Sequence, residues 1–278
     1  MKTLENKVVV ITGAGSGIGR QVALRAARAG ALLAVSDWNE AGLGETVDLL
    51  KAAGVRELRS DRVDVSDRTA VAEWATAVAD QFGRVNMLVN NAGVSMTGDF
   101  EEMSYEDFDW IVGINFNGVV NGTKEFLPHL IASGDGHLIN LSSLFGLVSV
   151  PGQTAYNATK YAVRGFTEAL REEMLVSGHP VGVTCVHPGG IKTGISRNGR
   201  KTASQDADAL DSLFEKKLAR MTPEKAAKII LNGALSGKAR VLVGADAHAL
   251  HHLAKLTGSR YQDIVAKQFS KVAPPRKS

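Results

Sequence analysis

The first half of the chain repeats one pattern: a short apolar run rich in β-branched residues, a turn, and a longer amphipathic stretch. Apolar runs of this length predict buried strands, and stretches with a 3.6-residue period predict helices. We expect the long helix near residue 105 to end at Pro128. The pattern predicts strands at 8–12, from 32–35 to Asp37, and at 58–65, 86–90, 137–141, 181–186 and 240–243, and helices at 18–29, 40–53, 68–82, 105–127, 155–175 and 223–235.

Strands that alternate with helices favour a parallel sheet, because parallel neighbours need long right-handed crossovers. The predicted fold class is α/β: a doubly wound, Rossmann-like parallel sheet of about seven strands with helices on both faces. No linker interrupts the alternation, so one domain is expected over residues 1–246. It includes a polar, turn-rich lid at 190–221, and residues 247–278 form a C-terminal helical extension with a basic tail.

Composition removes several classes of function. The 278 residues are 44% hydrophobic and 22% charged, with a net charge of +3. Basic residues are scattered outside the tail, so no nucleic-acid partner is expected. The single cysteine, Cys185, cannot form an internal disulfide and suits a reducing cytoplasm. We expect no signal peptide, because polar residues from Lys2 to Lys7 lead straight into a short strand-like run. We expect no transmembrane segment, because no apolar stretch approaches roughly 20 residues.

A glycine-rich turn, Thr12 to Gly19, separates the first predicted strand from the first helix. Backbone N–H groups at a helix N-terminus attract anions, and glycines let a pyrophosphate approach them. The turn therefore predicts a dinucleotide site. The spacing of Gly13, Gly17 and Gly19 differs from G-x-G-x-x-G, so an ordinary glycine turn stays open as the alternative.

An acid follows at the end of the next predicted strand. Asp37 can accept hydrogen bonds from both adenosine ribose hydroxyls and would repel a 2′-phosphate, which favours NAD over NADP. The alternative is that Asp37 caps the next helix. Asp64 and the segment Asn90 to Gly93 also follow strands, at the edge where ligands bind in such sheets.

Tyr156 and Lys160 stand four residues apart on a predicted helix, on one face. At an effective dielectric of about 20, a cation near 5 Å favours tyrosinate by roughly 3 kcal/mol, or about two pKa units. Such a phenol can exchange a proton with an alcohol or a carbonyl, although Tyr-Lys pairs are also common on exposed helix surfaces. Ser142 and Ser143 end the fifth predicted strand, and Asn115 interrupts an apolar helix, where a break or an ordered water is expected.

These motifs together resemble the short-chain dehydrogenase/reductase family. Thr12 to Gly19 match its T-G-x-x-x-G-x-G turn, Asn90 to Gly93 its N-N-A-G segment, and Tyr156 with Lys160 its Y-x-x-x-K pair, over about residues 5–195. The resemblance implies that Tyr156 is the catalytic acid/base and that Ser143, thirteen residues earlier, orients the substrate oxygen. It further implies that Lys160 lowers the tyrosine pKa and binds the nicotinamide ribose, and that Asn115 holds a relay water.

The resemblance also implies a set of cofactor contacts, with Ile191 and Thr193 meeting the nicotinamide carboxamide. The expected NAD-binding residues are Gly13, Ser16, Gly17, Ile18, Gly19, Asp37, Asp64, Val65, Asn90, Asn91, Ala92, Gly93, Tyr156, Lys160, Pro188, Gly189, Ile191 and Thr193. The implied function is NAD(H)-dependent interconversion of a secondary alcohol and a ketone. The alternative is a dinucleotide-binding regulatory protein without turnover, against which the intact catalytic set argues.

The C-terminal part departs from the family. Many members end with a glycine-rich D-G-G segment and form tetramers, whereas about thirty residues follow Asp246 here, so a homodimer through the helices near 104–127 and 154–176 stands beside a homotetramer. His248, His251 and His252 have helical spacing, but no cysteine or paired acid completes a metal site, and none is expected. We expect instead an amphipathic helix with Leu250, Leu253 and Leu256 facing inward, with membrane-surface contact as the weaker reading.

The substrate is a small alcohol or ketone on this interpretation. Several apolar side chains fall near segments expected to line the site, which hints at an apolar substrate, although ordinary core and lid packing explains them equally well. They are Val94, Met96, Leu144, Val150, Ile195, Phe214 and Leu218.

Overall fold

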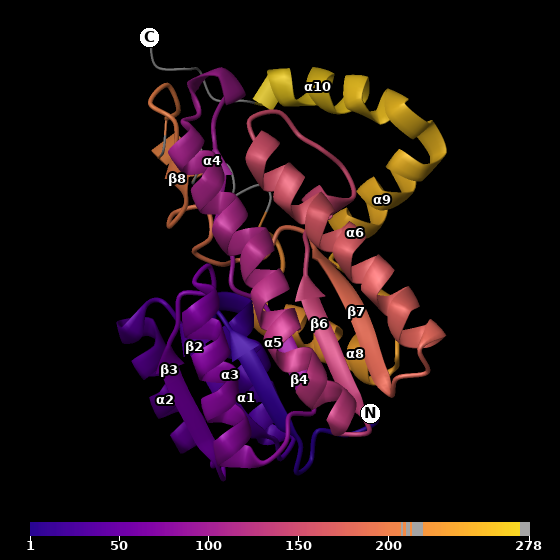
Figure 1. Cartoon of the computed structure of the whole chain (residues 1–278). Helices are drawn as coiled ribbons and strands as arrows, with labels where there is room; N and C mark the ends of the chain where they lie inside the picture. Colours follow the sequence, from indigo (N-terminus) through magenta and orange to yellow (C-terminus); the bar gives the residue numbers. More distant parts are fainter. Residues whose placement is uncertain (207, 210–211, 213–218, 273–278) are drawn as a thin grey trace.

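A seven-stranded sheet forms the centre of the molecule (Figure 1). The structure is a computed structural model and describes residues 1–206, 208–209, 212 and 219–272. The strand order is β3-β2-β1-β4-β6-β7-β9, and every neighbouring pair is parallel. The strands are β1 (Val8–Thr12), β2 (Leu32–Asp37), β3 (Leu58–Arg62), β4 (Met87–Asn90), β6 (Gly136–Leu141), β7 (Val181–Pro188) and β9 (Arg240–Val243).

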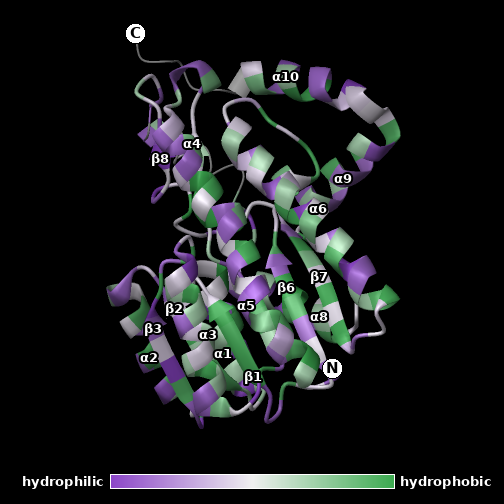
Figure 2. Ribbon diagram, in the orientation of Figure 1, coloured by the Kyte–Doolittle hydropathy of each residue, from purple (hydrophilic) through white to green (hydrophobic). Residues whose placement is uncertain are grey.

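Helices cover both faces of this sheet, as expected. α1 (Gly17–Arg28), α2 (Glu40–Ala52) and α8 (Pro223–Leu235) pack on one face, and α3 (Arg68–Phe82), α5 (Gly118–Ala132) and α6 (Thr154–Val176) on the other. Successive side chains of a strand point to opposite faces. Val9 accordingly joins the first cluster and Val10 the second. Figure 2 shows the result, with hydrophobic central strands and hydrophilic positions on the outer sides of the helices.

The helix expected at 105–127 is in fact three segments. α4 (Tyr105–Val112) passes into a π-helical turn at Gly113–Asn117, and α5 then continues to Ala132 with Pro128 inside it. The expectation that Pro128 ends the helix is therefore wrong. Pro128 is exposed, where water can satisfy the freed carbonyl, and the fully buried side chains of Phe126 and Leu130 hold the helix on both sides of it.

The bounds of two predicted strands also change. β7 continues two residues beyond the expected 186, to Pro188. β3 ends at Arg62, three residues short of the expected 65, because this edge strand pairs only with β2. A second sheet was not expected: β5 (Met96–Thr97) pairs in parallel with β8 (Arg200–Lys201), which ties the lid to the segment after β4. Strands of two residues have no recognisable period. Phe214 and Leu218 of the lid lie outside the described residues.

The C-terminal extension is helical, as predicted, with α9 (Ala245–Thr257), a short η5 turn (Gly258–Arg260) and α10 (Tyr261–Val272). The expected inward face is partly wrong. Leu250 packs against the body with Ala247 and Ala254, but Leu256 is 87% exposed. Positions 247, 250 and 254 share one helix face, and 256 is turned away from it. No helix among the described residues is both long and apolar enough to span a membrane.

Candidate active site

The glycine turn is built against the segment that follows β4. Gly13 has φ of +66° and Gly19 lies against the backbone of the turn: a Cβ on Gly19 would come 2.2 Å from the Gly13 carbonyl oxygen. Asn91 donates from Nδ2 to the carbonyls of Thr12 and Gly13, and the Thr12 hydroxyl accepts from the N–H groups of Asn91 and Ala92. The turn and the N-N-A-G segment therefore form one rigid unit.

The start of α1 offers free donors beside this turn. Ser16 occupies the N-cap position without a side-chain hydrogen bond to the helix, and the first turn of α1 carries no acidic side chain. Its N–H groups are thus left for an anion. A cavity of about 600 Å³ lies next to them, lined by Gly17, Arg20, Gln21, Lys192, Thr193, Gly194, Arg197, Ala219 and Pro223.

Asp37 ends β2 beside the same turn. Its Oδ2 accepts from Gly15 N at 2.8 Å and its Oδ1 from Asn39 N at 2.9 Å. The cap of α2 is Asn39, whose side chain accepts from Gly42 N, so the capping alternative for Asp37 is wrong. Arg20, a cation on α1 close to the glycine turn, is held by Gly15 O, Gly42 O and Glu45.

A second cation near Asp37 was missed by the sequence reasoning. Arg62 is the register partner of Asp37 on β3, and its guanidinium lies 4.0 Å from the ring centroid of the exposed Trp38. Neither Arg62 nor Trp38 belongs to a sequence motif. Only the pairing of β2 with β3 brings these two side chains together, and a sequence does not give that register.

The remaining residues expected after strands divide between surface and core. Asp64 accepts from the backbone N and hydroxyl of Ser66. Val65 is buried, and its carbonyl accepts from Asn121. Asn90 is also buried and donates to Asn140 and Thr123, so its side chain connects β4, β6 and α5.

Asn115 lies fully buried within the π-helical turn, where a break was predicted. Its Oδ1 accepts from Val94 N at 2.8 Å, and its Nδ2 donates to Val94 O at 2.9 Å. A Cβ on Gly93 would come 3.1 Å from Asn115 Oδ1 and 3.4 Å from Lys160 Nζ. The lack of a side chain at Gly93 therefore lets Asn115 and Lys160 approach the same backbone.

The two serines after β6 have different partners. The hydroxyl of Ser143 hydrogen-bonds with Tyr156 and accepts from Phe145 N. Ser142 instead donates to the carbonyl of Lys160 at 2.7 Å. Phe145 packs its ring edge-to-face on Tyr156, with centroids 6.1 Å apart. The tyrosine is therefore positioned by the segment that carries Ser143.

Lys160 lies beneath Tyr156 on α6. Its Nζ is 5.6 Å from the tyrosine ring centroid and donates to Leu141 O at 3.1 Å. Burial lowers the pKa of Lys160 to about 8. Burial also raises the pKa of Tyr156, and the hydrogen bond from Ser143 only partly opposes this. The attraction of the lysine predicts a lowered tyrosine pKa, but the cost of burying a phenolate acts in the opposite direction and is larger.

His187 supports Ser143 from β7 and was missed. Its Nδ1 lies 2.9 Å from Ser143 O, its Nε2 has no partner, and its side chain is fully buried. Burial lowers its pKa to about 4, so the ring is neutral at neutral pH. Its position directly before Pro188 is the only signal that the sequence offered.

The loop after β7 reaches both halves of the site. Thr193 lies over the glycine turn, with Cγ2 3.0 Å from where a Cβ on Gly17 would stand. Gly190 N donates to Asp246 at 2.7 Å, and a Cβ on Gly189 would also clash with that carboxylate. Pro188 ends β7. The side chain of Ile191 is buried in the core, and its backbone forms a bridge with Met221. Only the backbone of Ile191 is therefore available to contact a cofactor.

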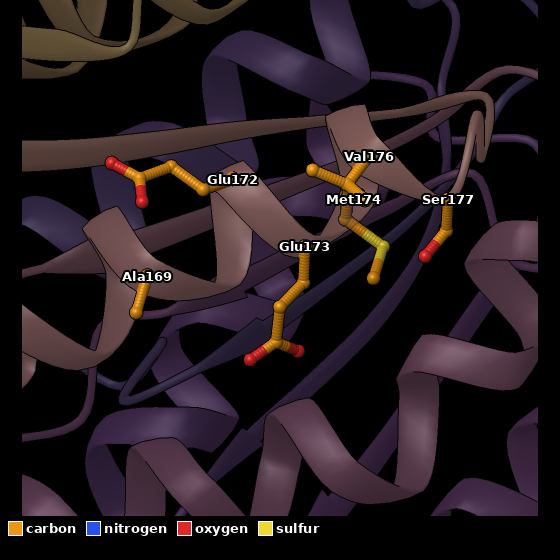
Figure 3. A pocket seen from close by; sticks show the side chains of 6 residues that line it. All are labelled: Ala169, Glu172, Glu173, Met174, Val176 and Ser177. Atoms are coloured by element: carbon orange, nitrogen blue, oxygen red, sulfur yellow. The ribbon is translucent and has the colours of Figure 1, made fainter.

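A separate hollow of about 470 Å³ lies near the end of α6 (Figure 3). Figure 3 shows Glu172 and Glu173 beside it, with Met174 and Val176. Tyr156 and Lys160 lie in the first two turns of α6, so this hollow is far along the helix from the site. Among the described residues, no group of three or more His, Cys, Asp or Glu side chains is arranged to hold a metal ion.

The sequence and the fold are similar to those of known proteins. Residues 7–204 match the family described as short chain dehydrogenase, and the chain belongs to this family of oxidoreductases. It is 53% identical over 274 residues to SadH of Mycobacterium tuberculosis, an oxidoreductase by name, with 99% of each chain covered.

Two solved structures extend this likeness. A short-chain dehydrogenase/reductase from Burkholderia phymatum, in complex with NAD, superposes with a TM-score of 0.87 at 32% identity and covers 94% of this chain and 97% of its own. Levodione reductase superposes with a TM-score of 0.77 at 26% identity, over 89% of this chain and 98% of its own.

Proposed function

We propose that this protein interconverts a secondary alcohol and a ketone with NAD(H) as cofactor. The observation that carries the proposal is the contact set around Tyr156: Ser143 on its hydroxyl, Phe145 on its ring and Lys160 beneath it. Short-chain dehydrogenase membership supports the reaction class. In the proposed roles, Tyr156 exchanges a proton with the substrate oxygen and Ser143 donates a hydrogen bond to that oxygen.

The residues present fit a dinucleotide. The uncapped N-terminus of α1 suits the pyrophosphate, and Asp37, at the end of β2, suits the adenosine ribose. Lys160 would hold the nicotinamide ribose, with Thr193 and the backbone of Ile191 at the carboxamide. When bound, NAD accepts or donates the hydride at its nicotinamide ring and, in oxidised form, adds positive charge to the site.

Positive charge matters here because burial alone raises the pKa of Tyr156. Lys160 holds its ammonium beneath the ring, and its hydrogen bond to Leu141 O orients it there. A cation close to the phenol favours the deprotonated form and so opposes the cost of burial. Asn115, held on both sides by Val94, is the proposed holder of a relay water between the lysine and solvent.

The preference for NAD over NADP rests on Asp37. Its carboxylate would repel a 2′-phosphate. Arg62, which lies opposite Asp37 in the pairing of β2 with β3, is stacked on Trp38.

An apolar substrate is supported by the side chains packed around Tyr156. These are Val94, Met96, Met103, Phe108, Trp110, Ile111, Phe145 and Ile195.

We also propose a homodimer or a homotetramer, with a dimer contact through the helices near 104–127 and 154–176, and a cytoplasmic location. The apolar side chains of Leu175 and Val176, 62% and 88% exposed on α6, support the first. The buried, unpaired thiol of Cys185 is compatible with the second.

A cofactor and substrate screen tests the function. Purified protein is mixed with NAD or NADP and a panel of secondary alcohols, and absorbance of the reduced cofactor is followed. We expect turnover of apolar secondary alcohols, with kcat/KM at least roughly tenfold higher for NAD, since charge-assisted hydrogen bonds contribute about 1.5–3 kcal/mol. Asp37→Asn should reduce that preference. A clear preference for NADP would contradict the role of Asp37, and no turnover of any alcohol or ketone would contradict the function.

A further inference from the structure

The C-terminal helices are fastened to the loop that follows Ser143. Leu144 and Val148 of this loop are buried against Ala247, Leu250 and Ala254 of α9, and Tyr261 at the start of α10 joins the same cluster. Figure 1 shows α10 crossing the end of the molecule beyond the arrowhead of β6. That is the end at which the proposed substrate site lies.

One side chain makes the polar part of this attachment. The Tyr261 hydroxyl accepts from Ser149 N at 3.2 Å and lies 2.8 Å from the Ser149 hydroxyl. It also hydrogen-bonds with Tyr161 of α6. A single phenol oxygen therefore connects α10, the loop and α6.

The loop transmits this attachment to the site. Asn157, next to Tyr156, donates to the carbonyls of Phe145 and Val148, which fixes the loop from α6. Phe145 packs on the Tyr156 ring and belongs both to the apolar cluster around Tyr156 and to the cluster beneath α9. The ring of Phe145 thus forms a wall shared by the proposed substrate site and the C-terminal extension.

Most of α10 has little burial of its own to hold it in place. Ile264 of α10 is 41% exposed. Leu256, in the last turn of α9 before it, is 87% exposed. At the other end of the extension, Asp246 accepts from Gly190 N on the loop expected to meet the nicotinamide. The extension therefore touches the cofactor loop through its first turn and the substrate loop through Tyr261.

We propose that Tyr261 is a positioning residue for substrate selection: it holds the loop 144–150 so that Phe145 forms the wall against which an apolar substrate packs. This rests on the proposed function. A substrate with a longer apolar chain contacts this wall, whereas a very small one does not reach it. Removing the Tyr261 hydroxyl therefore lowers kcat/KM for the longer substrate more than for the smaller one.

The test compares Tyr261→Phe with wild type on 2-octanol and 2-propanol. We expect the ratio of the two kcat/KM values, octanol over propanol, to fall about fivefold, which corresponds to about 1 kcal/mol. A variant that merely folds less well loses active enzyme equally for both alcohols, so the ratio separates positioning from stability. The matched control is Tyr105→Phe, which removes a hydroxyl from a side chain that is 88% exposed on α4.

Hydrogen–deuterium exchange gives a readout that does not need turnover. Peptides covering residues 144–150 should exchange faster in Tyr261→Phe than in wild type and Tyr105→Phe, because Ser149 N loses its acceptor. An unchanged or higher alcohol ratio would overturn the positioning role, whatever the exchange shows. If wild type turns over neither these two alcohols nor any other alcohol or ketone of the panel, the proposed function has failed, and unchanged exchange would then overturn the attachment as well.

Discussion

At the scale of single residues, the site is governed by burial as much as by charge. Tyr156 and Lys160 are 9% and 4% exposed, and burial disfavours the charged form of each. Ser143 offsets part of this for the tyrosine by a hydrogen bond. The protein alone thus keeps its proposed acid/base protonated, and the balance shifts only when further positive charge enters the site.

His187 gives a prediction on stability against pH. Its pKa is about 4 in the folded protein and about 6.5 when unfolded, so the unfolded state binds a proton that the folded state does not. Its contribution to stability is complete above pH 6.5 and is lost as pH falls toward 4, by about 3 kcal/mol. His187→Asn should remove that part of the acid sensitivity, measured by urea unfolding at pH 7, 5.5 and 4.5.

An exposed histidine provides the control. His179→Asn, in the loop before β7, makes the same substitution at an exposed side chain, and its urea unfolding is measured at the same three pH values. His137, whose pKa burial likewise lowers to about 4, keeps part of the acid sensitivity in every variant. If His187→Asn loses as much stability between pH 7 and 4.5 as wild type does, the proposed cost of charging His187 is wrong.

The sequence located much of the candidate site because its motifs are local. Glycines at a strand-helix junction and a Tyr-Lys pair on one helix face have a physical meaning that needs no knowledge of distant contacts. Phe145, His187 and Tyr261 could not be found in this way. Each acquires its position from packing between elements far apart in the chain, and an isolated aromatic or histidine carries no signal of that packing.

At the scale of elements, the lid is held by Arg200. Its guanidinium pairs with Asp107 at 2.9 Å and lies 4.2 Å from the ring centroid of Trp110, both on α4. This bond lowers the pKa of the Asp107 carboxyl. The short pairing of β8 with β5 brings the lid to Met96, which is fully buried beside Tyr156.

Loosening this attachment should weaken substrate binding. We expect Arg200→Leu to raise KM for an apolar alcohol about fivefold with a smaller change in kcat, because a cation–π contact with an ion pair contributes about 1 kcal/mol. Steady-state kinetics at saturating NAD measure this. The control is Arg59→Leu, which breaks an ion pair with Asp61 on the edge strand β3. A KM equal to that of wild type would show that the lid does not depend on Arg200.

The elements themselves were predictable where a period repeats over several turns. The strands of the central sheet and the helices that cover it follow from the hydrophobic pattern. The predictions for Pro128 and Leu256 were wrong for two different reasons. Pro128 sits within a helix because core packing outweighs its local cost, and Leu256 is exposed because α9 turns a different face inward than its leucines suggested.

At the scale of the whole molecule, the parallel sheet explains why the site is where it is. All seven strands run in one direction, so the residues that follow β1, β2, β4, β6 and β7 meet at one edge. The glycine turn, Asp37, the N-N-A-G segment, Ser143 and the loop after Pro188 all lie there. The C-terminal helices cover the same end of the molecule (Figure 1).

The proposed reaction at this edge depends on proton exchange through Tyr156 during hydride transfer. The most direct measurement is kcat of Tyr156→Phe on an alcohol that wild type oxidises, together with the dissociation constant for NADH from fluorescence titration. We predict that kcat falls by at least about 10³-fold, within the range of general acid–base catalysis, while NADH affinity stays within about fivefold. If Tyr156→Phe retains more than about a tenth of wild-type kcat, Tyr156 is not the acid/base of the reaction.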